Sequence, residues 1–150
     1  MVAPPATEPL ARRMPGVADS RVLDVGHGEL GFRRRRALAR DLRALAYDQA
    51  IVLPNSFKSA LLPFWAGIPR RTGWLGESRS LVLNDRRRLD PARYPLMIER
   101  FMALALAPDE ALPEPYPLPQ LTADGDAAEA LAARLGLVGG DVTALCPGAE

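Results

Sequence analysis

The fold of this chain is decided by the stretch Ala50-Ile-Val-Leu-Pro-Asn-Ser-Phe-Lys-Ser59. Its first four residues form an apolar run typical of an interior strand, and Ser56 is a suitable N-cap for the amphipathic segment that follows. A strand that leads into the N-terminus of a helix presents free backbone N–H groups and the positive end of a helix dipole. Lys58, the only lysine in the chain, adds a full charge there. The stretch therefore predicts an anion-binding turn at the edge of an α/β sheet.

The residues before this stretch complete a βαβ unit. The expected elements are a short helix at residues 7–14, a strand at 21–25, a glycine-containing loop at 26–31 and a helix at 32–47. Leu38, Leu42 and Leu45 share one face of the last helix, which is typical of a helix that packs on a core. Another face carries Arg36, Arg40 and Arg43. Strand, helix and strand in this order predict parallel strands.

The residues after the central stretch predict two more short strands and two more helices. Strands or extended segments are expected at 71–74 and 81–83, and Pro91 suits the first turn of the next helix. Its core-facing residues are expected to be Tyr94, Met97, Ile98, Phe101, Leu104 and Ala105.

A cluster of prolines between residues 108 and 119 must be extended, because proline interrupts both helices and central strands. This segment is the best linker candidate. Beyond it, Asp126 and Glu129 form an N-capping pattern for a helix that Gly136 ends, and residues 142–146 are expected to be a strand.

The composition is that of a soluble globular protein, with 48% apolar and 25% charged residues in a chain of 150. A net charge of +1 gives no case for bulk attraction to nucleic acid, so no nucleic-acid partner is expected. Cys146, a single cysteine, is typical of a buried thiol in a reducing compartment. Early prolines interrupt any signal-peptide core, and no apolar run approaches the ~20 residues of a spanning helix. A cytoplasmic location follows as the expectation.

Several separated motifs occur in the order of a known family. They are Gly26–Gly31, Tyr47–Ala50, the run from Ala50 to Trp74, Leu83–Arg87, Met97–Phe101 and Ala144–Glu150. In this order they resemble the ADP-heptose-using lipopolysaccharide heptosyltransferases of glycosyltransferase family 9, and most of all the type II members. The resemblance implies a Rossmann-like parallel sheet, the N-terminal half of a GT-B glycosyltransferase without its first strand. Residues 1–120 would form the acceptor-side domain, and residues 121–150 the interdomain connection and the start of the nucleotide-sugar domain.

The same resemblance implies a reaction. In the family a base deprotonates an acceptor hydroxyl, which attacks the anomeric carbon of the heptose as ADP leaves. The donor is ADP-heptose, the acceptor is the heptose/Kdo inner core of lipopolysaccharide, and no cofactor or metal is expected. The presumed base would lie upstream of Met1, so no catalytic residue is predicted in this chain and it is expected to be inactive alone. The family implies work at the cytoplasmic face of the inner membrane.

The candidate site residues are polar and mostly cationic. The predicted acceptor-binding residues are Asn55, Ser56, Lys58, Arg70, Arg71, Arg86 and Arg87, and the predicted donor-side turn contains Gly148 and Glu150. Arg33, Arg34, Arg35 and Arg36 are predicted to form an electrostatic patch toward the membrane or the acceptor. The plainer alternatives are a helix cap with a solvated lysine, a solvated helix start, and arginines 86–88 paired with Asp85 or Asp90.

Three further residues could contact a ligand. His27 lies between glycines and is a plain loop residue or an exposed base, with no neighbours at the spacing of metal ligands. Trp65 is expected in the core, and Trp74, after Gly73, is the better candidate for stacking on a sugar. Two other functions stay open: a non-catalytic module that binds an anionic glycolipid or phosphosugar, and an unrelated Rossmann-like nucleotide-binding domain.

Overall fold

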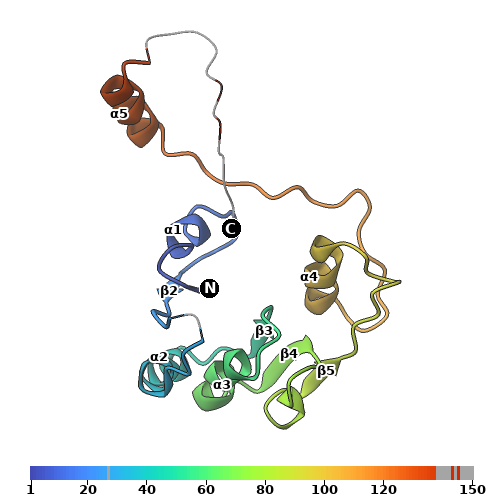
Figure 1. Cartoon of the computed structure of the whole chain (residues 1–150). Coiled ribbons are helices and arrows are strands. Elements are labelled where there is room, and N and C mark those ends of the chain that lie inside the picture. The colour runs from blue at the N-terminus through green and yellow to red at the C-terminus, as the bar shows by residue number, and fades with distance from the viewer. Residues whose placement is uncertain (27, 138–142, 144, 146–150) are drawn as a thin grey trace.

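The computed structural model describes residues 1–26, 28–137, 143 and 145. Short parallel strands alternate with helices along most of the chain (Figure 1). The elements are β1 Val2–Ala3, α1 Glu8–Ala11, β2 Arg21–Val22, α2 Phe32–Ala44, β3 Gln49–Val52, α3 Phe57–Ala66, β4 Arg70–Trp74, the 3₁₀ turn η1 Arg79–Leu81, β5 Asp85–Arg87, α4 Met97–Ala105 and α5 Gly125–Leu135.

All the strand pairs of the described residues are parallel, as predicted, but β2 and β3, the two strands of the predicted βαβ unit, lie in separate sheets. β1 pairs with β2, and β3, β4 and β5 form a sheet in that order. Ile51 pairs with Thr72 and Val52 with Gly73 in the β3–β4 ladder, while Thr72 pairs with Asp85 in the β4–β5 ladder. The carboxyl ends of β3, β4 and β5 therefore meet at one edge of the sheet and their amino ends at the other.

The apolar core has three clusters, and helices that pack on the sheet contribute side chains to each of them. α2 and α3 pack against each other through Ala39, Leu42, Leu62, Ala66 and Ile68. A second cluster joins α3 to the sheet through Val52, Ala60, Leu61, Val82 and Leu83. The third cluster, under α4, comprises Trp74, Tyr94, Ala103 and Leu104. Burial of a leucine, isoleucine or valine side chain contributes roughly 1.5 to 3 kcal/mol, so these clusters hold the helices on the sheet.

α3 follows the sequence prediction closely. Ser56 is its N-cap residue, with extended backbone angles, although its side chain makes no capping hydrogen bond. Instead the Ser59 hydroxyl donates to the Ser56 carbonyl oxygen at 2.6 Å. Gly67 ends the helix with φ +74°, a conformation that glycine adopts without strain. The strand–turn–helix unit is thus formed as expected.

The segment between β4 and α4 differs from the prediction. Residues 81–83 are not a strand, since a 3₁₀ turn ends at Leu81 and the strand is Asp85–Arg87. The next helix begins at Met97 and not at Pro91, because the Asp90 carboxylate accepts backbone N–H groups of Ala92 and Arg93 and closes a separate turn.

The buried face of α4 differs in part from the predicted one. Tyr94 and Leu104 are buried as predicted, but Glu99 and Ala103 are buried too, whereas Met97 and Phe101 are exposed. The helix is rotated toward Trp74 and Tyr94, which a periodicity count on α4 alone does not reveal.

The last described helix, α5, lies apart from the sheet at the end of the extended proline-rich segment (Figure 1). Its N-cap is Asp124, whose carboxylate accepts the Ala127 N–H at 3.0 Å, so the predicted cap at Asp126 was two residues late. Gly136 ends the helix as predicted, with φ +68°. No residue of α5 is buried, and its leucines are exposed. The strand predicted at 142–146, with Cys146, lies outside the described residues.

Candidate functional site

Two loops lie at the carboxyl edge of the sheet. One joins β3 to α3 and contains Pro54, Asn55 and Ser56, and the other follows β4 and contains residues 75–80. Because β3 and β4 are parallel neighbours, their loops emerge side by side. This edge is where open α/β sheets bind their ligands.

Glu77 occupies the helix N-terminus that the sequence predicts as an anion site. Its carboxylate accepts the Phe57 N–H at 3.0 Å. A carboxylate is stabilised in this position by the positive end of the helix dipole. The chain therefore supplies its own anion to the first turn of α3, and an external anion bound there would compete with Glu77.

Lys58 lies at the same edge and bridges to a third loop. Its ammonium group donates to the Glu29 carbonyl oxygen at 3.4 Å. The Glu29 carboxylate in turn accepts the Gly26 N–H at 3.2 Å, which closes the glycine-containing loop on itself. Within the described part of the chain, the long bond to the Glu29 carbonyl oxygen is the one hydrogen bond of the Lys58 ammonium group. It holds Lys58 only weakly, so its charge is available to an anionic ligand at this edge.

Arg79 is a residue of this site that sequence reasoning missed. Its side chain is 0% exposed, and Nη1 donates to the Trp74 carbonyl oxygen at 3.1 Å and to Asn55 Oδ1 at 3.4 Å. Its Nε and Nη2 atoms have no partner among the described residues. Burial lowers the pKa of Arg79. No local pattern in the sequence distinguishes this arginine from the exposed ones.

Gly73 explains how Arg79 can be buried. A Cβ at this position would lie 3.0 Å from Arg79 Nη2, 3.1 Å from Leu83 Cδ1 and 3.3 Å from the Val52 carbonyl oxygen. Only glycine leaves this space for the guanidinium beneath the Asn55 loop. Arg79 thus ties the end of β4 to the loop that follows β3.

Arg70 and Arg71 lie at the opposite, amino edge of the sheet. They are the first two residues of β4, whereas Asn55 and Lys58 follow the carboxyl end of β3. Arg71 donates to the carbonyl oxygens of Val82 and Ile68, at 2.7 and 2.6 Å. The structure therefore does not bring these two arginines together with the central turn, although all were predicted as one acceptor site.

Asp85 organises the charges on β4 and β5. Arg87 Nε lies 2.9 Å from Asp85 Oδ1, Arg70 Nη2 lies 3.0 Å from Oδ2, and the Thr72 hydroxyl donates to Oδ2 at 2.9 Å. The hydrogen bond from Arg87, with those from Thr72 and Arg70, lowers the pKa of Asp85 to about 2, against the opposing effect of its burial. Arg87 also donates to the carbonyl oxygens of Ala103 and Leu106 near the end of α4. Arg70 and Arg87 are engaged in structural contacts.

Side chains alternate between the two faces of a strand, so Arg86 lies on the opposite face of β5 from Asp85 and Arg87. It is exposed, whereas those two are half-buried. Its one hydrogen bond among the described residues is to the Ser80 carbonyl oxygen, at 3.4 Å. Ser80 belongs to the carboxyl-edge loop, so Arg86 is the predicted arginine that the structure places beside the Arg79 and Glu77 loop. Lys58 and Arg86 are thus the candidate cations of this edge, with Asn55 and Ser56 between strand and helix.

The arginine run 33–36 does not form a uniform patch. Arg35 is 7% exposed and donates to the Leu30 carbonyl oxygen at 2.9 Å, and burial lowers its pKa. Arg34 contacts the Asp24 carboxylate at 3.5 Å. Arg36 lies over the Trp65 ring, 5.5 Å from its centroid. Since Arg35 points into the protein, it cannot take part in a surface patch as predicted.

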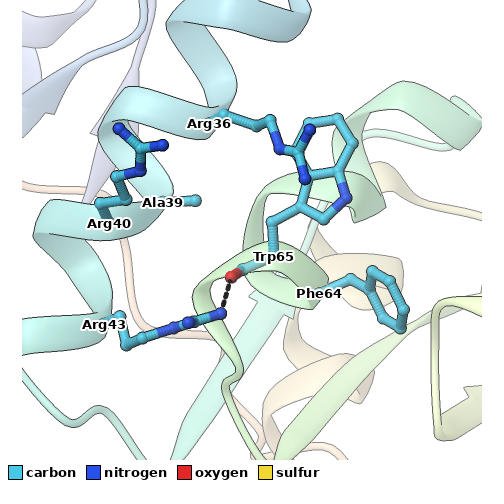
Figure 2. A pocket seen from close by; sticks show the side chains of 6 residues that line it. All are labelled: Arg36, Ala39, Arg40, Arg43, Phe64 and Trp65. Carbon is cyan, nitrogen blue, oxygen red and sulfur yellow. Dashed lines mark hydrogen bonds between the residues drawn. The ribbon is translucent and has the colours of Figure 1, made fainter.

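Both tryptophans contact the apolar core, although only Trp65 was expected there. Trp74 is 4% exposed and packs against the Tyr94 ring at 5.9 Å between centroids, so it is a core residue and not a stacking surface for a sugar. Trp65 is half-buried and lines a pocket between α2 and α3, shown in Figure 2. His27, Gly148 and Glu150 lie outside the described residues.

Two possible features find no support in the described part of the chain. No group of three or more His, Cys, Asp or Glu side chains is arranged there as a metal site. No helix there is both long and apolar enough to cross a bilayer.

The parallel sheet and its polar carboxyl edge define a Rossmann-like ligand-binding domain. Residues 35–150 match the family model of glycosyltransferase family 9 (heptosyltransferase), and the chain belongs to this family. It is 44% identical over 161 aligned positions to lipopolysaccharide heptosyltransferase 2 of Escherichia coli K12, covering all of this chain and 45% of that protein. The same figures hold for lipopolysaccharide heptosyltransferase 2 of Salmonella typhimurium LT2. The chain thus spans about half the length of these relatives.

A solved structure is similar as well. The structure of E. coli ADP-heptose lps heptosyltransferase II matches with a TM-score of 0.78 and 42% sequence identity, over 91% of this chain and 41% of that one. This match confirms the predicted fold class, a Rossmann-like α/β half of a GT-B glycosyltransferase. The family and the fold expected from the motifs are both correct.

Proposed function

We propose that this chain is the acceptor-side part of an enzyme that transfers L-glycero-D-manno-heptose from ADP-heptose to the heptose/Kdo inner core of lipopolysaccharide. The observation that carries the proposal is the polar carboxyl edge of the sheet, with Asn55, Lys58 and Arg86 around the N-terminus of α3. It is supported by the 44% identity to proteins named lipopolysaccharide heptosyltransferase 2.

For this transfer, the carboxyl edge of the sheet must bind an anionic sugar acceptor. Kdo carries a carboxylate, and inner-core sugars carry phosphates. Lys58 is suited to a point contact with such a group, and Arg86 to a bidentate one. The buried Arg79 guanidinium donates to Asn55 Oδ1 and so fixes the orientation of the Asn55 side-chain amide. Binding an acceptor in this way orients its hydroxyl for attack on the heptose, which is the positioning contribution to catalysis.

The remaining chemistry is assigned to the parts of the relatives that this chain does not match. A general base that deprotonates the acceptor hydroxyl and the groups that stabilise the leaving ADP are the two contributions this transfer needs. We propose that neither comes from the described residues, that no cofactor or metal is used, and that the chain alone does not turn over ADP-heptose. The place of action is proposed to be the cytoplasmic face of the inner membrane, where a lipid-linked acceptor would be met.

Binding to defined ligands tests the proposal. Titration of the chain with a Kdo-containing inner-core oligosaccharide, followed by backbone amide NMR, should shift the signals of residues 55–58 and 76–80. The shifts should weaken as salt is raised, because the contacts are ionic and exposed. Saturable binding of ADP at these loops, with no effect of the oligosaccharide, would contradict the proposal and favour a nucleotide-binding domain.

A further inference from the structure

A pocket of about 310 Å³ lies between α2 and the C-terminal end of α3 (Figure 2). Its lining residues are Arg36, Ala39, Arg40, Arg43, Phe64 and Trp65. α3 is ten residues long, or about 15 Å, and its N-terminus carries the loops of the candidate acceptor site. The pocket is therefore at the other end of this helix and separate from that site.

The pocket has an excess of positive charge. Three arginines line it and no acidic residue does. Arg43 is fixed, because Nη2 donates to the Trp65 carbonyl oxygen at 2.6 Å and Nε to the Ala66 carbonyl oxygen at 3.3 Å. These are carbonyl groups at the end of α3, where a cation is favoured by the helix dipole. Arg36 lies over the Trp65 ring (Figure 2). Neither Arg36 nor Arg40 forms an ion pair with another described residue.

Exposed aromatic rings border the cations. Phe64 is 43% exposed, and Phe32, which packs against Trp65 with ring centroids 5.8 Å apart, is 49% exposed. Arg71 covers the Phe64 ring, 5.6 Å from its centroid. Rings that are apolar on one side and bordered by arginines on the other are typical of a surface that lies at an anionic bilayer interface.

We propose that this pocket binds the phosphate group of an anionic phospholipid while Phe32 and Phe64 enter the headgroup region. The choice of occupant follows from charge complementarity and from the exposed rings, which a free phosphate ion would leave in water. The inference rests on the proposed function in one respect, that the acceptor is attached to a lipid. The proposed membrane-facing surface therefore differs from the predicted patch at residues 33–36. It consists of arginines on successive turns of α2, namely Arg36, Arg40 and Arg43, together with aromatic residues of α3.

Vesicle binding of the whole chain tests this assignment. Wild type should cosediment with vesicles that contain phosphatidylglycerol and not with pure phosphatidylcholine. The pair Arg36→Gln/Arg40→Gln should weaken binding about 25-fold, since each arginine close to an anionic surface contributes roughly fivefold. The matched pair Arg88→Gln/Arg134→Gln removes the same charge from exposed positions outside the pocket and should weaken it less than threefold. Arg40→Gln alone, at an exposed position, provides a variant with little risk to folding.

Each other outcome overturns the inference. Equal losses in the two pairs would mean that net charge, and not this pocket, drives binding. Failure of the wild-type chain to bind anionic vesicles would mean that the pocket is no lipid site. Binding of inorganic phosphate without any vesicle binding would make it a site for free phosphate. Either result would leave the oligosaccharide titration unaffected, so a failed lipid site and a failed acceptor site are told apart.

Discussion

The two edges of the parallel sheet use the same kind of residue for different purposes. At the amino edge, Arg70 and Arg71 are held by short bonds to Asp85 and to backbone carbonyl oxygens. At the carboxyl edge, Lys58 and Arg86 each make one bond, of 3.4 Å, to the residues that the structure describes. Cations with satisfied partners stabilise the fold, and cations with weak partners are free to bind a ligand. The partners of a charge, and not its residue type, thus separate the cations that stabilise the fold from the candidate ligand-binding cations.

The largest effect should come from breaking the amino-edge network. Asp85→Ala leaves Arg87, Arg70 and Thr72 without their shared acceptor, and the Asp85 side chain is only 19% exposed. The free energy of unfolding should fall by about 3 kcal/mol in a urea titration, because loss of one partner leaves a desolvated charge. The matched control is Asp109→Ala, which removes an exposed pair with Arg93 and should cost less than about 0.5 kcal/mol. Equal losses of unfolding free energy in the two variants would mean that Asp85 contributes no more to stability than an exposed ion pair does.

The pH dependence of stability should report the same network. The folded-state pKa of Asp85, about 2, lies below its ordinary value of 3.8. Its carboxylate therefore stabilises the fold above the unfolded-state pKa, and this stabilisation is lost as the pH falls from about 5 toward 2. Unfolding free energies measured over this range should drop by roughly 2 kcal/mol more in wild type than in Asp85→Ala. Parallel profiles would show that the carboxylate is not preferentially bound in the fold.

Arg79→Met should separate stability from binding at the carboxyl edge. The substitution removes a buried cation whose Nε and Nη2 atoms have no partner among the described residues, so the free energy of unfolding should change by less than about 1 kcal/mol. Asn55 loses its partner, and the affinity for inner-core oligosaccharide should fall about fivefold. A strong loss of stability with unchanged affinity would make Arg79 purely structural. Arg93→Met, at an exposed position, provides the control for a generic loss of charge.

Glu77→Gln should have the smallest effect and the opposite sign. It keeps an acceptor for the Phe57 N–H but removes the negative charge that competes with a ligand at the α3 N-terminus. Oligosaccharide affinity should rise about threefold. Glu110→Gln is the matched control, because Glu110 also accepts a backbone N–H, from Ala107, far from this edge along the chain. Lower affinity in Glu77→Gln would mean that the carboxylate supports the ligand instead of competing with it.

Where sequence and structure agree, the signal is local. The strand and helix around Ser56, the helix end at Gly67 and the parallel order follow from apolar runs, a cap and a glycine. The strand Asp85–Arg87 was missed because charged residues are rare in buried strands, and here Asp85 is satisfied by Arg87 within the strand and by Arg70 and Thr72 across the sheet. Arg79 was missed for the same reason, since its burial depends on Gly73 and the Trp74 carbonyl oxygen.

One miss could have been avoided. Arg35 lies four and seven residues before Ala39 and Leu42, both buried, so helical spacing alone places it on the inner face of α2. The members of the arginine run 33–36 point in different directions around the helix, so the run is not one block of surface charge. The candidate site could be predicted as far as the turn at 54–58. The second loop of the site could not be predicted, because Glu77 and Arg79 join it through contacts with Phe57 and Asn55 of another segment.

The most direct test of the difference between the two edges is to compare Lys58→Ala with Arg70→Ala in one oligosaccharide titration followed by amide NMR, with urea unfolding of both variants. Lys58→Ala should weaken binding about tenfold and leave stability within about 0.5 kcal/mol, because its one bond is long and exposed. Arg70→Ala should keep wild-type affinity and lose stability through Asp85. Loss of affinity in Arg70→Ala as large as that in Lys58→Ala would contradict the assignment of acceptor binding to the carboxyl edge.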